Sequence, residues 1–145
     1  MKSIKINHGS RKLLFVAILA PFIFLLSSCA TKMAFHTSSV VPAAEGSVKV
    51  KKDSNKNYNV NLSVKRLASP ERLSPSKKMY IVWMNTSQDG VKKIGQLTTS
   101  SSLLSSTLTS SLKTSVPFEP TGFFITAEDD ASIESPLGTV VLTTQ

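Results

Sequence analysis

Two stretches of this chain alternate strictly between apolar and polar residues, and this alternation limits the fold more than any other feature. Residues 48–51 read Val-Lys-Val-Lys, and residues 57–65 repeat the pattern over nine positions. Because successive side chains of a strand point to opposite faces, each stretch predicts a strand with one buried and one solvated face. The polar turn at 53–57 favours an antiparallel hairpin. Its buried face would be lined by Val48, Val50, Tyr58, Val60, Leu62 and Val64.

The rest of the chain reads as further strands separated by turns. Residues 79–84 (MYIVWM) are apolar at both parities, which indicates a strand covered on both faces. Strands are also predicted at 91–97, 123–127 and 139–143. The segment 98–115 has leucines spaced by four, as in a helix, but its many serines and threonines favour a strand. About seven strands predict an all-β chain, folded as a small antiparallel, immunoglobulin-like β-sandwich.

The N-terminus has the order of regions that marks a secretory signal. Residues 1–12 carry four basic residues and no acid, and residues 13–26 are uncharged and strongly apolar. Two serines then precede Cys29, which is the only cysteine in the chain. The apolar run is shorter than the roughly 20 residues that span a bilayer as a helix. An ordinary cleaved signal and an uncleaved signal anchor are both compatible with these regions.

The tetrapeptide Leu-Ser-Ser-Cys at 26–29 resembles the lipobox of bacterial lipoproteins. The resemblance implies cleavage between Ser28 and Cys29 and acylation of Cys29, so that membrane lipid is a partner. Ala30 follows, where an Asp would favour inner-membrane retention; the resemblance therefore implies the periplasmic side of the outer membrane, with the inner membrane as the alternative. Residues after Cys29 are small and lack periodicity, as in linkers. Three parts are expected: a signal peptide at 1–28, a flexible lipidated tether at 29–45 and a β-sandwich domain at 46–145.

The charge of the chain limits its partners. Four of the 17 basic residues lie in the signal, which leaves 13 basic and 9 acidic residues and a net charge of +4. Residues 30–93 hold 12 basic and 4 acidic side chains, whereas residues 94–145 hold 1 and 5, so the surface is expected to be dipolar. Because an exported protein does not meet nucleic acid, none is expected as a partner. Anionic headgroups or cell-wall polymers are the alternatives to a merely solvated face.

The residue types give little support for catalysis, and we expect no enzyme activity and no cofactor. His36 is the only histidine after the signal, and it lies in the expected tether, so no serine has an evident base. Trp83 is expected in the core, with ligand stacking as the alternative. An acidic turn without EF-hand spacing offers weak calcium candidates, although a solvated turn is favoured. These candidates are Glu128, Asp129, Asp130 and Glu134.

A spaced series of residues runs through the second half of the chain. The series is Tyr80-x-x-Trp83, Gly90, Gly95-x-Leu97, Phe124-x-Thr126-x-Glu128 and Pro136-x-Gly138-x-Val140-Val141-Leu142. It resembles the extracytoplasmic C-terminal domain of anti-sigma-K-type factors, and the resemblance implies a compact sandwich outside the inner membrane. The first twelve residues hold no counterpart of that family's cytosolic zinc-binding domain, so anti-sigma activity is not implied.

Together these features predict a membrane-anchored envelope lipoprotein with a non-catalytic binding or structural β-sandwich. The alternative is an accessory sensor module in envelope signalling, related to the extracytoplasmic domains of anti-sigma factors. An envelope protein or a glycan is expected as a further partner, and the residues do not identify it.

Overall fold

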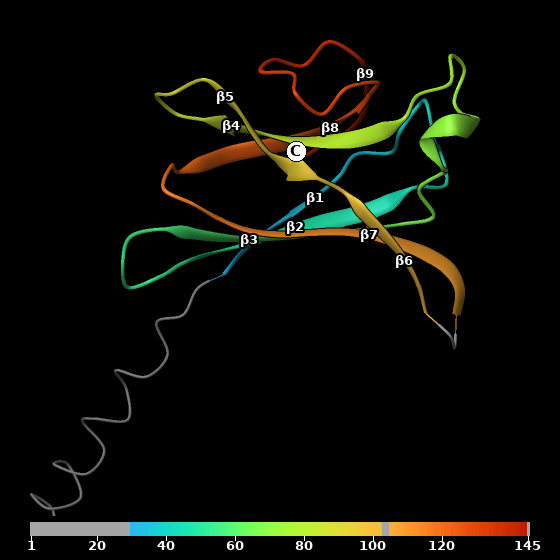
Figure 1. Cartoon of the computed structure of the whole chain (residues 1–145). Coiled ribbons are helices and arrows are strands. Elements are labelled where there is room, and N and C mark those ends of the chain that lie inside the picture. The colour runs from blue at the N-terminus through green and yellow to red at the C-terminus, as the bar shows by residue number, and fades with distance from the viewer. Residues whose placement is uncertain (1–29, 103–104, 145) are drawn as a thin grey trace, which may run out of the picture.

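The computed structural model describes residues 30–102 and 105–144, which form two β-sheets packed face to face (Figure 1). A 3-10 turn, η2 (Pro70–Arg72), lies between β3 and β4. No helix in the described ranges is long and apolar enough to cross a membrane. The strands are β1 (Thr31–Ala34), β2 (Glu45–Lys52), β3 (Tyr58–Lys65), β4 (Met79–Thr86), β5 (Val91–Gln96), β6 (Thr98–Ser102), β7 (Ser105–Val116), β8 (Pro120–Glu128) and β9 (Thr139–Thr143).

The strand order confirms the expected all-β, immunoglobulin-like sandwich. The described residues form nine strands rather than about seven, because β1 lies in the expected tether and the segment 98–115 forms two strands. The five-stranded sheet has the order β1-β2-β3-β7-β6, and the four-stranded sheet has the order β5-β4-β8-β9. All of these pairings are antiparallel. Apart from β1, the two sheets follow the A-B-E-D and C′-C-F-G orders of immunoglobulin-type domains.

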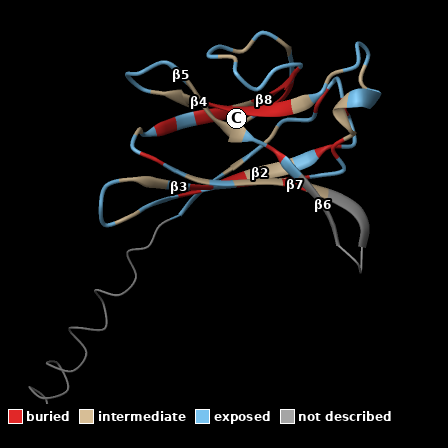
Figure 2. Ribbon diagram, viewed as in Figure 1, coloured by how far each residue is buried: buried red, intermediate tan, exposed pale blue. Residues whose placement is uncertain are grey.

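The predicted hairpin is present in the predicted register and forms one wall of the core. In the β2–β3 pair, Val48 lies opposite Leu62 and Val50 lies opposite Val60. The valines and Leu62 are buried, while Tyr58 is half-buried. The inward residues of the four-stranded sheet pack against them, so burial concentrates between the layers (Figure 2). They include Val82, Met84, Phe123, Ile125 and Val141.

The segment 98–115 forms two strands, so the expectation of a single strand there is wrong. β5 runs through the buried Leu97 into β6, which changes sheets and pairs with β7. Gly95 has a φ of +151° at this crossing, and a Cβ there would lie 2.8 Å from the Leu112 side chain. Leu112 packs against the core from β7, which agrees with the strand parity of the leucines. Leu104 lies outside the described residues.

The expectation of a flexible tether at 29–45 is also wrong over its described part, because the folded unit begins at β1. Thr31 to Ala34 pair with β2, and Phe35 forms a bridge with Thr144 beside β9. Ser38 is buried, and its hydroxyl donates to the Val141 carbonyl at 2.6 Å. This segment therefore joins the two sheets along one side. A four-residue strand followed by a buried serine has too little alternation to be recognised as a strand.

Candidate functional site

The described residues include the predicted acidic site but not the predicted lipidation site. Ser28 and Cys29 lie outside the described residues, so cleavage and acylation stay predictions. Ala30, the next residue, is exposed at the start of the folded unit. The acidic turn is fully described, and its carboxylates can be examined individually.

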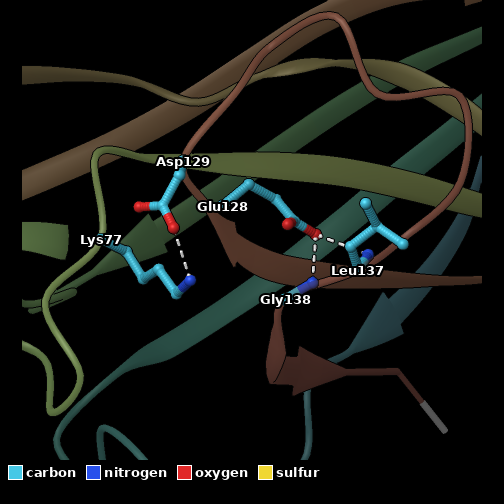
Figure 3. Close-up of polar contacts among 5 residues, drawn as sticks. All are labelled: Lys77, Glu128, Asp129, Leu137 and Gly138. Carbon is cyan, nitrogen blue, oxygen red and sulfur yellow. Dashed lines mark hydrogen bonds and ion pairs between the residues drawn. The ribbon is translucent and has the colours of Figure 1, made fainter.

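Glu128 is a structural residue that holds the loop at 129–138. Its side chain is buried, and Oε1 accepts hydrogen bonds from the backbone N–H groups of Gly138 at 2.9 Å and Leu137 at 3.2 Å (Figure 3). A Cβ at Gly138 would overlap the Ala127 carbonyl oxygen, so the close approach requires glycine. The interpretation of this glutamate as part of a solvated turn is therefore wrong: its carboxylate is used inside the fold.

The other acids of the turn are exposed and do not converge on one point. Asp129 pairs with Lys77 at 2.7 Å (Figure 3). Asp130 accepts hydrogen bonds from the backbone and hydroxyl of Ser132, and these bonds lower the pKa of Asp130. Glu134 is exposed further along the loop. Within the described ranges, no three histidine, cysteine or acidic side chains are grouped so as to hold a metal ion.

Trp83 is fully buried, but on the outer side of the four-stranded sheet rather than between the sheets. Its indole N–H donates to the Thr126 hydroxyl at 2.8 Å, and its ring stacks on Phe124 with centroids 6.3 Å apart. The loop at 129–138 lies over this side of the sheet (Figure 1), and Lys93 fixes the loop by donating to the carbonyls of Ala131 and Ile133. The ring is covered, so this structure offers no surface for ligand stacking.

His36 is exposed beside β9. Its backbone N–H donates to the Thr143 carbonyl at 2.9 Å, so the segment that carries it is held in the fold. His36 is the only histidine among the residues that the structure describes. The assignment of His36 to a flexible tether is therefore wrong.

The surface with a distinct chemistry is the outward side of the five-stranded sheet, which we call the lysine face. Its strands place every second residue outward, and the register puts Lys32, Lys49, Asn61 and Lys113 side by side across β1, β2, β3 and β7. The face is completed by polar side chains, and Glu45 is its one acid. The outward residues of these four strands that bear charge or an amide are Lys32, Glu45, Lys49, Lys51, Asn59, Asn61, Lys65 and Lys113.

A shallow hollow marks the middle of the lysine face. It has a volume of about 570 Å³. Ala30, the first described residue, lines it together with Lys49, Lys51, Asn61 and Lys113. The alternation in the sequence places the β2 lysines on a solvated face, but the neighbourhood of Lys32 and Lys113 depends on strand order, which no local pattern reveals.

Comparison with known proteins adds no relative. No protein-family model, curated protein or solved structure matches the chain. The likeness to anti-sigma-K-type extracytoplasmic domains therefore stays a prediction.

Proposed function

We propose that the chain is a bacterial envelope lipoprotein whose sandwich is a non-catalytic binding or structural module. The observation that carries the proposal is the lipobox-like sequence at 26–29, directly after a short apolar run with a basic start. Acyl chains on Cys29 would each contribute roughly 0.8 kcal/mol per buried CH₂, and two or three chains make membrane attachment stable. Ala30 favours the periplasmic side of the outer membrane, with the inner membrane as the alternative.

The fold adds a geometric consequence to this proposal. β1 begins at Thr31, two residues after Cys29. Two residues of extended chain reach about 7 Å. An acylated Cys29 would therefore hold the sandwich against the bilayer surface rather than at the end of a long tether.

The sensor alternative has weaker support. Residues of the anti-sigma-like series hydrogen-bond to one another within the fold. The Trp83 indole N–H donates to the Thr126 hydroxyl, and the Gly138 N–H donates to the Glu128 carboxylate. The Leu97 N–H donates to the Tyr80 carbonyl. These hydrogen bonds stabilise the four-stranded sheet and carry no argument for signalling. Crosslinking that recovers a signalling protein from the membrane would be needed to favour a sensor.

Intact mass of the membrane-extracted protein tests the proposal. We expect the mass of residues 29–145 plus acyl groups, and we expect Cys29→Ala to abolish this species. Ser28→Ala is the matched control, because it keeps a small residue before the cysteine and should leave processing intact. An unmodified full-length chain would contradict the proposal and would favour an uncleaved signal anchor.

A further inference from the structure

We propose that the lysine face binds the anionic phospholipid headgroups of the membrane that carries the anchor, so that the sandwich lies flat on the bilayer. The proposal rests on the lipoprotein function for the presence of a membrane. Its evidence is separate, and it comes from the charge distribution and from the place where the chain enters the fold.

The lysine face holds the whole excess charge of the domain. Residues 30–145 carry 13 basic and 9 acidic side chains, a net charge of +4. The lysine face carries five lysines and one glutamate, which is also +4, so the rest of the domain has eight charges of each sign and is balanced. Glu45, the single acid, is paired with Arg66 at the edge of the face. A negative surface therefore attracts this side of the molecule above all others.

The arrangement of the donors fits phosphate groups on a plane. Lys32, Lys49, Asn61 and Lys113 occupy adjacent strands, and strands lie about 4.8 Å apart, so the row spans roughly 14 Å. Ammonium and amide groups both donate hydrogen bonds to phosphate oxygens. A sheet face presents these donors together, as docking on a surface requires.

The chain enters the fold on this same side. Ala30 lines the hollow in the lysine face with Lys49 and Lys113. Cys29 is the next residue toward the N-terminus, so an acyl chain attached there enters the membrane beside the lysines. This position favours a bilayer over a soluble polyanion as the occupant.

In the alternative, upright orientation, the end of the sandwich where β1 begins faces the membrane. The turns at that end carry Lys52, Asp53, Lys56, Asp89 and Glu119, of which two are basic and three are acidic. An anionic surface gains nothing from contact with these turns. Electrostatics therefore favours the flat orientation.

Vesicle cosedimentation of unacylated residues 30–145 tests the proposal without the anchor. All described strands and core residues lie between 31 and 144, so this chain holds the complete sandwich. We expect binding to vesicles of equal phosphatidylglycerol and phosphatidylcholine, weakening with salt, and none to phosphatidylcholine alone. A lysine near an anionic surface contributes about five-fold to affinity, so Lys49→Gln with Lys113→Gln should weaken binding about 25-fold.

Arg72→Gln with Lys78→Gln is the matched control, since it removes the same charge from exposed residues outside the lysine face. It should change binding by less than two-fold, and thermal melts should show that both double variants are folded. Equal losses in the two variants, or binding to phosphatidylcholine, would overturn the proposal. Preferential binding of soluble polyphosphate or polygalacturonate over the anionic vesicles would overturn it too, and would assign the face to a polymer.

The orientation has its own readout in the acylated protein. An environment-sensitive fluorophore on Asn61→Cys should be quenched by spin-labelled headgroups in anionic nanodiscs, whereas one on Ser87→Cys in the β4–β5 turn should not. The reverse pattern would support the upright orientation and contradict the proposal. If intact mass shows no acylation but vesicle binding still depends on the lysines, the proposed lipid anchor is contradicted and the proposed binding by the lysine face is supported. Acylation without lysine-dependent binding would leave the anchor in place and overturn the docking face.

Discussion

The hydrogen bond between Trp83 and Thr126 predicts a specific loss of stability on substitution. The indole N–H donates to the Thr126 hydroxyl at 2.8 Å, and both residues are fully buried. Thr126→Val keeps nearly the same side-chain volume but removes the acceptor, so a buried N–H loses its partner. Leaving such a donor unpaired costs about 1–3 kcal/mol. Because the shape is retained, the cavity contribution that accompanies large-to-small substitutions is small.

Urea unfolding of residues 30–145 measures this loss, with Trp83 as the single tryptophan reporter and circular dichroism as a second probe. With a denaturant slope of about 1.5 kcal/mol per molar, a loss of about 2 kcal/mol lowers the midpoint by roughly 1.3 M. Thr121→Val, at an exposed position of the same strand, is the control and should shift the midpoint little. Faster exchange of the Trp83 indole proton should accompany the loss. Equal midpoints for the two variants would refute the role of this bond.

Three further predictions concern the hairpin, the pH dependence and the acidic turn. Val60→Asp should unfold the domain by circular dichroism, because it buries a charge, whereas Asn59→Asp should be nearly neutral; equal effects would contradict the register. Burial raises the pKa of Tyr80 to about 12. The free energy of unfolding measured by chemical denaturation should therefore be constant below about pH 10 and should fall between about pH 10 and 12. Tyr80→Phe should remove this pH dependence. Millimolar calcium should leave the melting temperature unchanged, because Glu128 already accepts hydrogen bonds from the backbone and Asp129 is paired with Lys77. A raised melting temperature would show a cation site.

The alternation of residues predicted the core hairpin because a period of two is sufficient to assign both strand and face. Val48, Val60 and Leu62 are buried as their parity requires. The apolar run at 79–84 was likewise correctly predicted to be covered on both sides. Its outer cover could not be predicted, since the loop at 129–138 that lies over this side of the sheet (Figure 1) has no regular pattern in sequence and is held by Lys93. Only the folded chain brings that lysine to the loop carbonyls.

The errors share a physical cause, which is dependence on partners distant in sequence. β1 is ordered by pairing with β2, and Ser38 can be buried because the Val141 carbonyl accepts a hydrogen bond from its hydroxyl. The lysine face is similar: the outward parity of Lys49 is local, but its proximity to Lys113 requires β3 to lie between them. Local patterns thus assign faces, while the composition of a surface depends on strand order.

The chain connects the two sheets along both sides of the sandwich, and this affects how copies of the protein associate when they are crowded together. Exposed edge strands can recruit other chains into intermolecular sheets. Here Phe35 and His36 pair with the chain beside β9, and β5 continues directly into β6 at the other side. Edge lysines, such as Lys32 on β1 and Lys92 on β5, add mutual repulsion between copies. Under the proposed membrane anchoring, these features would disfavour edge-to-edge pairing between copies crowded in the membrane plane.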